Sequence, residues 1–526
     1  MELIWQYSDV SLEQTFCSLS PEKKGIIMEK HTYKNPVFFI SAIIVGLLVL
    51  AGALFTETFK AIANQLFSFT TINFGWFYLL AVFIFVMFLA ILSLTRYGKI
   101  RLGPKGSRPE YPFFTWIGML FSAGFGAGLV FWGVAEPMSH FFETPFTGLE
   151  AQTEEAARIS MGYSFFHWAV SQWSVFAVVG LIIAFLQFKK EKKGLISTAI
   201  EPVVGSNRIL GGTVDTLAVI ATVMGVATSL GLGISQMNGG LKSVFGVPNA
   251  ITIQMIIAAV MLVTYLISSS TGLNRGIKWL SNLNLGLCLL LLVFVFIAGP
   301  TVFILDTFVL GLGDYITNFV SYSFRLTPYS GESWVTEWTI FYWAWSTAWS
   351  PFVGAFVARV SRGRTIREFV FGVLVVPPVI ACLWIAAFGG TAIYSDLFNG
   401  TQIAEAVNAD MTVALFETFA NLPMPNVLSI LAILLIFTFL VTSADSATYI
   451  LGSMTSKGSL NPALTVKIIW GVLITAIAVV LLFAGGLNAL QTASLTSALP
   501  FTIILLLIVV AFIKMIKKEQ VPKKGE

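Results

Sequence analysis

Residues 338–369 read WTIFYWAWSTAWSPFVGAFVARVSRGRTIREF, an aromatic and apolar run that passes directly into a basic segment. The apolar part is about twenty residues long, the length of a helix that crosses roughly 30 Å of hydrocarbon. Basic residues next to a membrane helix are retained on the cytoplasmic side during insertion. The stretch therefore predicts a transmembrane helix followed by a cytoplasmic loop that holds Arg359, Arg362, Arg364 and Arg367.

The composition of the whole chain has the same character. Of the 526 residues, 56% are hydrophobic and 11% are charged, and the mean hydropathy is +0.84. Soluble domains carry roughly a quarter of charged residues, so this chain has too few of them to cover a surface that faces water. The composition predicts an all-α integral membrane protein and excludes an ordinary soluble enzyme.

Apolar runs of spanning length recur along the chain, and we predict about twelve transmembrane helices from them. The predicted spans are 36–55, 74–95, 112–135, 161–187, 209–236, 249–269, 279–304, 336–358, 368–394, 426–452, 466–486 and 496–516. The amphipathic stretch 312–330 is too polar to be counted, and we expect it to lie at an interface.

The loops between these spans alternate in charge. Basic loops follow the second, fourth, sixth, eighth and tenth spans, whereas the loop 136–160 is acidic and includes Glu136. His140, in the same loop, is expected to lie in water. The alternation predicts an even number of spans in the cell membrane, with both termini cytoplasmic. The net charge of +4 is distributed over these loops, so no nucleic-acid partner is expected. The basic tail is suited either to contact with anionic membrane lipid or to anchoring on the cytoplasmic side.

Glycines stand at every second position in the third span, at Gly124, Gly126 and Gly128. Each weakens a helix by about 1 kcal/mol relative to alanine. Inside a membrane such a segment can unwind and offer backbone groups to ions or solutes. Small residues also allow close helix packing, so the spacing alone leaves both interpretations open.

Aromatic residues run into the interior of two spans. Trp168, Trp173 and Phe176 fall within about 140° of one another on a continuous helix. The eighth span adds a further tryptophan cluster, in which Trp345 and Trp349 are four residues apart. Aromatic faces attract a cation, although tryptophans also mark membrane interfaces. A cation-binding box is one interpretation, and interfacial anchoring or packing is the other.

Polar residues in the tenth span can serve an ion. The hydroxyls of Thr442 and Ser443 can coordinate sodium or bond back to their own helix. Asp445 is costly near a membrane end, which makes it a functional candidate. His167 in the fourth span is expected to be a hydrogen-bonded structural residue rather than a proton carrier. The chain holds no H-E-x-x-H metal motif and no convincing catalytic dyad, so we do not expect an enzyme.

Four strings taken together resemble the betaine/carnitine/choline transporter family. They are SAGFGAGLVFWGVAEP (122–137), FHWAVSQW (166–173), the stretch 338–369 quoted above and FLVTSADS (439–446). The resemblance implies a LeuT-type core of two inverted five-helix repeats, at about 112–304 and 336–516, with two leading helices. The transporter domain would cover 36–516, between a cytoplasmic arm, 1–35, and a short basic tail, 517–526. It also implies a homotrimer.

The resemblance further implies a solute site midway through the membrane and sodium sites beside it. The residues that match the solute site are Gly124, Phe125, Gly126, Gly128, Trp168, Trp173, Phe176, Trp345, Ser346 and Trp349. Those that match one sodium site are Ser122, Phe125, Phe439, Thr442 and Ser443, and those that match part of a second are Thr222 and Phe352. Sodium would be the coupling ion, and no other cofactor is implied.

Three positions depart from the family pattern. Ser346 replaces a tryptophan of betaine carriers, and GFGAG (124–128) replaces their GMGIG. Both changes put strict selectivity for a trimethylammonium group in doubt. A wider pocket with a hydroxyl suits ectoine or hydroxyectoine, while glycine betaine remains open. Val226 stands where a threonine hydroxyl is expected, which weakens the second sodium site.

The expected function is therefore the sodium-coupled import of a small zwitterionic osmolyte for osmoprotection, by alternating access. By the same resemblance, Thr442 and Ser443 favour sodium coupling over the sodium-independent exchange found in part of that family. The alternative is a proton-coupled choline or carnitine carrier.

Overall fold

The computed structural model describes residues 35–520 with the exception of 105, 125, 147, 271–275 and 332, and without the side chains of 121–124 and 276–279. The predicted N-terminal arm thus lies almost entirely outside the described residues. The described residues form helices joined by turns and loops, and their β-structure is limited to one isolated bridge between Arg101 and Thr365. Its main helices are α4 Pro36–Leu54, α5 Thr56–Leu94, α6 Phe113–Gly124, α7 Ala127–Phe142, α8 Glu154–Trp168, α9 Val170–Ala184, α10 Ile196–Val204, α11 Arg208–Phe245, α12 Ile251–Ser270, α13 Gly276–Ala298, α14 Thr301–Ser323, α15 Phe341–Val360, α16 Ile366–Asn399, α17 Ile403–Ala409, α18 Ala414–Ala420, α19 Pro425–Thr455 and α20 Leu464–Ile516.

Ten of the described helices, with α8 and α9 taken together as one, are long and apolar enough to cross a membrane. The predicted span 112–135 is divided between α6 and α7. The last two predicted spans both lie in α20, which is kinked at Gly485 and Gly486. The all-helical, multi-pass fold is confirmed, and the number twelve stays a prediction.

The predicted span 279–304 is wrong at its C-terminal end. Helix α13 ends at Ala298 and α14 begins at Thr301, because Pro300 has no N–H to continue the helix. Helix α14 includes most of the amphipathic stretch and is long and apolar enough to be a span. Its interfacial position stays a prediction.

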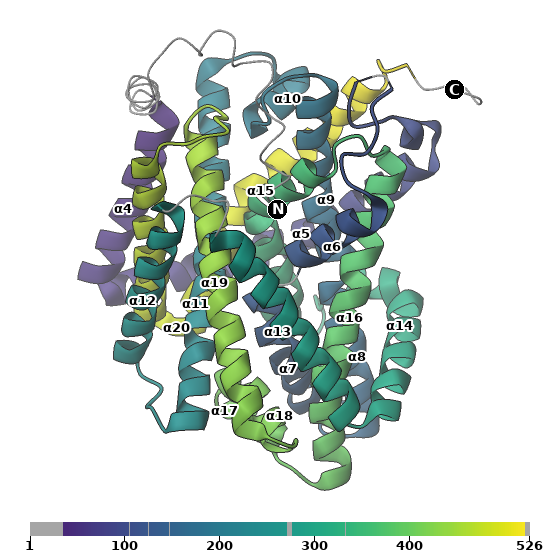
Figure 1. The fold of residues 1–526 in the computed structure, drawn as a ribbon, viewed down its shortest axis with the longest axis vertical. Helices are drawn as coiled ribbons and strands as arrows, with labels where there is room; N and C mark the ends of the chain where they lie inside the picture. The colour runs from purple at the N-terminus through teal and green to yellow at the C-terminus, as the bar shows by residue number, and fades with distance from the viewer. Residues whose placement is uncertain are drawn as a thin grey trace.

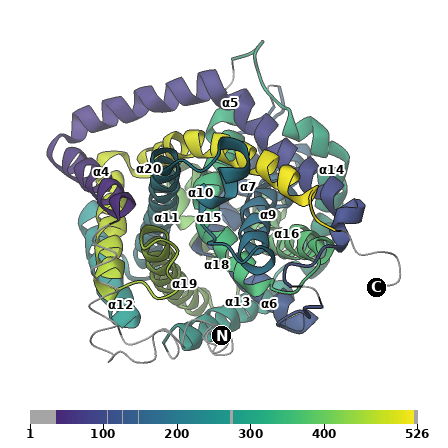
Figure 2. The same ribbon diagram turned by 90° about the horizontal axis from the view of Figure 1, so that it is seen from above.

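The helices form an inner group and an outer group (Figures 1 and 2). The most apolar windows of α8–α9 and α11 are 94% and 83% buried, whereas those of α4, α12 and α13 are 28% buried. The first part of α5 runs along the rim of the bundle in Figure 2. Exposed aliphatic side chains such as Leu47, Val263 and Val309 cover the outer helices, as expected where lipid is the solvent.

The basic segment after α15 holds α6 in place. Arg364 is buried, lies 4.6 Å from the Trp116 ring centre and donates to the Tyr111 carbonyl at 2.7 Å. The Trp116 indole N–H donates to the Ser361 hydroxyl at 3.1 Å. These contacts fix the helix that leads into the glycine-rich segment.

Candidate functional site

The glycine-rich segment interrupts the third span. Helix α6 ends at Gly124, α7 begins at Ala127, and Gly126 between them has an extended backbone with φ −145° and ψ 172°. Gly128 serves a different purpose. A Cβ atom there would lie 2.7 Å from Trp345 and 3.5 Å from Trp168. The segment thus combines a helix break with a close approach of two indole rings.

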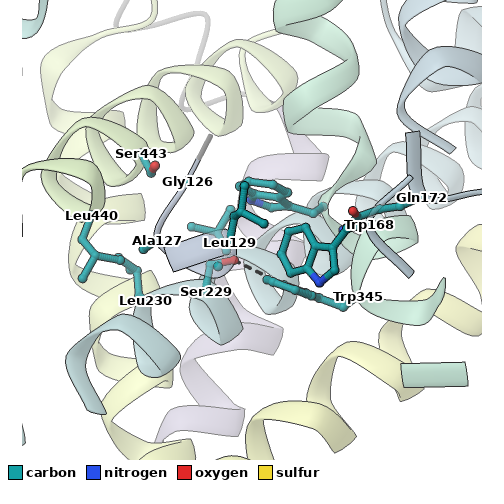
Figure 3. A pocket seen from close by; sticks show the side chains of 13 residues that line it. Gly126, Ala127, Leu129, Trp168, Gln172, Ser229, Leu230, Trp345, Leu440 and Ser443 are labelled. Atoms are coloured by element: carbon teal, nitrogen blue, oxygen red, sulfur yellow. Dashed lines mark hydrogen bonds between the residues drawn. The ribbon is translucent and has the colours of Figure 1, made fainter. Parts of the chain in front are cut away.

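A cavity lies directly beside this break, among α7, α8, α9, α11, α15 and α19 (Figure 3). The cavity leaves about 30 Å³ for the centres of water-sized molecules, so a solute of several heavy atoms must move its walls apart. The residues that line it are Gly126, Ala127, Gly128, Leu129, Trp168, Gln172, Val226, Ser229, Leu230, Trp345, Trp349, Leu440 and Ser443.

Three tryptophans form the aromatic wall. Trp345 and Trp349, one helical turn apart on α15, stack with ring centres 6.3 Å apart at an angle of 19°. Trp168 meets Trp345 edge to face at 6.1 Å. Phe341 stacks on the other side of Trp345 at 5.8 Å, nearly parallel. The Trp345 indole N–H donates to the Ser229 hydroxyl at 3.3 Å. The wall is therefore fixed by stacking and by a hydrogen bond.

Two other predicted aromatic residues are absent from the lining. The prediction of one continuous helix through the fourth span is wrong, because α8 ends at Trp168 and α9 begins at Val170, with a non-helical Ala169 between them. Trp173 packs edge to face on Phe176 at 5.4 Å, and Phe176 packs on Trp349 at 5.9 Å. They support the wall from behind.

Ser346 is also absent from the lining residues. Its hydroxyl donates to the Tyr342 carbonyl at 2.5 Å and lies 3.2 Å from the Trp343 carbonyl, and the residue is buried. The hydroxyl therefore satisfies its own helix, as serines commonly do in membrane helices. The hypothesis that it meets the solute gains no support from this geometry.

The structure describes three of the five residues predicted to bind the first sodium ion, namely Phe439, Thr442 and Ser443, with their side chains. Ser443 lines the cavity, and Phe439 precedes it by one turn on α19. The Thr442 hydroxyl lies 3.0 Å from the Phe439 carbonyl and accepts from the Asn284 amide at 3.2 Å. Phe125 and the Ser122 side chain lie outside the described residues.

The residues of the second predicted sodium site lie on neighbouring helices. The Thr222 hydroxyl on α11 donates to the Ala218 carbonyl at 2.7 Å. Phe352 on α15 packs on Trp349 at 5.7 Å. Val226 lines the cavity with an apolar side chain. The second site stays a prediction.

Sequence reasoning missed Gln172 and Ser229, which bring an amide and a hydroxyl to the cavity. Gln172 lies within the quoted string 166–173, but Ser229 sits in an apolar run that gives no signal. Asp445, a candidate from its cost in a membrane, is buried and accepts a hydrogen bond from Ser268 at 2.7 Å.

The prediction that Glu136 and His140 lie in a solvated loop is wrong. Both belong to α7, which continues to Phe142, and both are fully buried. Glu136 Oε1 accepts from His167 Nδ1 at 2.6 Å, and Oε2 accepts from Trp168 Nε1 at 2.8 Å and from the Tyr342 hydroxyl. The spacing of Glu136 and His140, four residues apart within apolar neighbours, was the available signal.

This cluster has the residue types of a metal site, since ligand atoms of Glu136, His140 and His167 lie within 4.8 Å of one another. Its carboxylate oxygens, however, already accept from an indole, a phenol and an imidazole. His167 Nε2 lies 2.9 Å from the Thr339 hydroxyl, so both its ring nitrogens have partners, as expected of a structural histidine. We interpret the cluster as a hydrogen-bonded group that holds the Trp168 ring in place through Glu136.

Comparison with known proteins agrees with this architecture. The model of the betaine/carnitine/choline family of transporters matches residues 36–521. An ectoine/hydroxyectoine transporter of Virgibacillus pantothenticus is 72% identical over 499 residues, which cover 95% of this chain and 99% of that protein. The glycine betaine transporter OpuD of Bacillus subtilis is 46% identical over 497 residues, which cover 94% and 96%. The chain belongs to the betaine/carnitine/choline transporter family.

Proposed function

We propose that this protein imports a small zwitterionic compatible solute, ectoine or hydroxyectoine with glycine betaine as a second substrate, together with sodium by alternating access. The observation that carries the proposal is the cavity at the α6–α7 break, walled by Trp168, Trp345 and Trp349. Stacked indole faces attract a cationic group. A helix break in the middle of a bundle supplies the free backbone groups that can meet a carboxylate or an ion.

The preference for ectoine has support from the relatives. The relative with 72% identity is named for ectoine and hydroxyectoine, and the one with 46% identity for glycine betaine. The much higher sequence identity to the first relative favours ectoine or hydroxyectoine as the substrate of this protein. Osmoprotection follows when such a solute accumulates without disturbing the proteins of the cell.

The proposal is tested by uptake of radiolabelled ectoine into a bacterium that lacks its own osmolyte carriers. We expect uptake to need external sodium and to be competed by hydroxyectoine and glycine betaine. Choline, carnitine and proline serve as competitors of different chemistry. Uptake of choline or carnitine that is independent of sodium and driven by a proton gradient would replace this proposal with the alternative carrier.

The aromatic wall gives a direct prediction. Trp349→Leu should weaken solute binding by about 0.5–2 kcal/mol, because the cation loses one aromatic face. Trp173→Leu removes a tryptophan that packs on Phe176 behind the wall, so it should mainly reduce the amount of folded protein. Calorimetric titration of the purified variants distinguishes these effects. Equal binding by both variants and wild type would show that the solute binds elsewhere.

A further inference from the structure

The carboxylate of Glu136 is fully buried in the part of the bundle that holds the cavity. A charge in such a place is expensive unless hydrogen-bond donors surround it. Among the described residues, the ionisable groups that lie close to it are His140, His167 and Tyr342. The indole N–H of Trp334 donates to His140 Nδ1 at 3.3 Å, which leaves the His140 proton on Nε2, 3.4 Å from Glu136 Oε1. Three donors, from His167, Trp168 and Tyr342, thus surround the carboxylate, and they stabilise a negative charge there although no lysine or arginine among the described residues pairs with it.

Two of these donors belong to the aromatic wall of the cavity or to its support. Trp168, whose ring lines the cavity in Figure 3, donates its indole N–H to Glu136 Oε2 at 2.8 Å. Tyr342 donates to the same oxygen and packs on Trp168 at 5.7 Å and on Trp345 at 6.2 Å. Trp168 is the last residue of α8, directly before the non-helical Ala169. The carboxylate thus holds the ring at a point where the backbone is broken.

The hydrogen bond also has an electrostatic effect on the ring. An anion at the N–H edge of an indole pushes electron density toward its π face, and a low dielectric strengthens this polarisation. The face of Trp168 that lines the cavity becomes a better partner for a cation. Glu136 therefore places a negative charge close to the cavity without exposing a carboxylate that could bind the cation directly and hold it.

We propose that Glu136 is a positioning residue for solute binding, which orients Trp168 through its indole N–H and strengthens the attraction of that ring for the cationic group of the solute. This inference rests on the proposed function of the tryptophan-walled cavity. It assigns a role in affinity to a residue that does not itself line the cavity.

The test is a double-mutant cycle on the purified full-length protein, with ectoine and glycine betaine as probes. We expect Glu136→Gln to weaken binding by roughly 10-fold, the size typical of a lost hydrogen bond to a charged group. Trp168→Phe keeps a ring but removes the N–H, and it should also weaken binding. The double variant should bind no more weakly than Trp168→Phe alone. Losses that multiply, or normal binding by Glu136→Gln, would overturn the inference.

Glu143→Gln is the matched control, since Glu143 is an exposed carboxylate at the C-terminal end of the same helix, and its binding should equal wild type. Should Glu136→Gln fail to fold, the vibrational spectrum of the Trp168 indole decides. The signal of this indole is isolated by subtracting the spectrum of Trp168→Phe from that of wild type. An N–H band in the difference spectrum that indicates only a weak hydrogen bond would refute the inference.

The proposed function has a separate test in the same experiment. A wild type that binds neither solute, or a Trp349→Leu variant that binds normally, would refute the cavity and the inference with it. Weakened binding in Trp349→Leu together with unchanged binding in Glu136→Gln would refute the inference alone.

Discussion

Replacing Gly128 with alanine is expected to weaken solute binding by roughly 10- to 100-fold, the equivalent of about 1–3 kcal/mol of overpacking. The added Cβ would lie 2.7 Å from Trp345, so the indole must move. Trp345 has little freedom to do so, because it is stacked between Phe341 and Trp349. The displaced ring would then fill space that the solute needs. Calorimetric titration with ectoine measures the loss.

The chain offers a matched control two residues earlier. An added Cβ at Gly126 would have its closest contact at 3.7 Å, with Trp349, which is ordinary van der Waals contact. The Gly126 backbone is extended, a conformation that alanine adopts without strain. Gly126 also lines the cavity, but no ring has to move to make room for its methyl group, so Gly126→Ala should bind more strongly than Gly128→Ala. A glycine-to-alanine change within α7 favours the helix by about 1 kcal/mol, which offsets part of the overpacking cost. Gly128→Ala should therefore lose much more binding than thermal stability. Normal binding by Gly128→Ala would mean that the solute does not enter between these rings.

The sequence was sufficient to predict the membrane-spanning helices and the glycine-rich break. It was not sufficient to predict which side chains of a helix face the cavity. The lengths of the apolar runs predicted the multi-pass helical fold, since crossing a bilayer as a helix sets a minimum length. The glycine spacing pointed to the break between Gly124 and Ala127 because glycine is the weakest helix former after proline. The break at Ala169 has no such signal. The angular argument, which grouped Trp173 with Trp168 on one continuous helix, was therefore wrong.

Glu136 was misplaced and Ser346 stays untested for one physical reason. Ser346 was expected to face the solute, which stays a prediction, and its hydroxyl donates to its own helix, a choice that the residue type leaves open. Glu136 was assigned to a solvated loop because it is the first of the glutamates that make residues 136–160 acidic. Its donors come from α8 and α15, far away in the chain, and only the tertiary structure brings them together. Burial of a polar group depends on partners that a single sequence does not display.

Removal of the hydroxyls of Thr442 and Ser443 should raise the sodium concentration needed for half-maximal uptake. Each lost ligand is expected to cost about 1–3 kcal/mol, as for a buried polar partner. Ser443 lines the cavity. The Thr442 oxygen accepts one hydrogen bond, from Asn284, which leaves it one lone pair for an ion. The variant Thr442→Val with Ser443→Ala keeps the volume of the first side chain, and ectoine uptake over a range of sodium concentrations measures the effect.

Thr438 provides the control for this double variant. It lies one turn before Thr442 on the same helix, and its hydroxyl bonds back to the Leu434 carbonyl at 2.8 Å. It is buried but is absent from the lining of the cavity. Thr438→Val thus removes a hydroxyl of the same kind from the same helix, and it should leave the sodium dependence of uptake unchanged. A double variant with wild-type sodium dependence and normal membrane insertion would place the coupling ion elsewhere. An equal shift in Thr438→Val would show that the loss comes from the helix rather than from ion ligands.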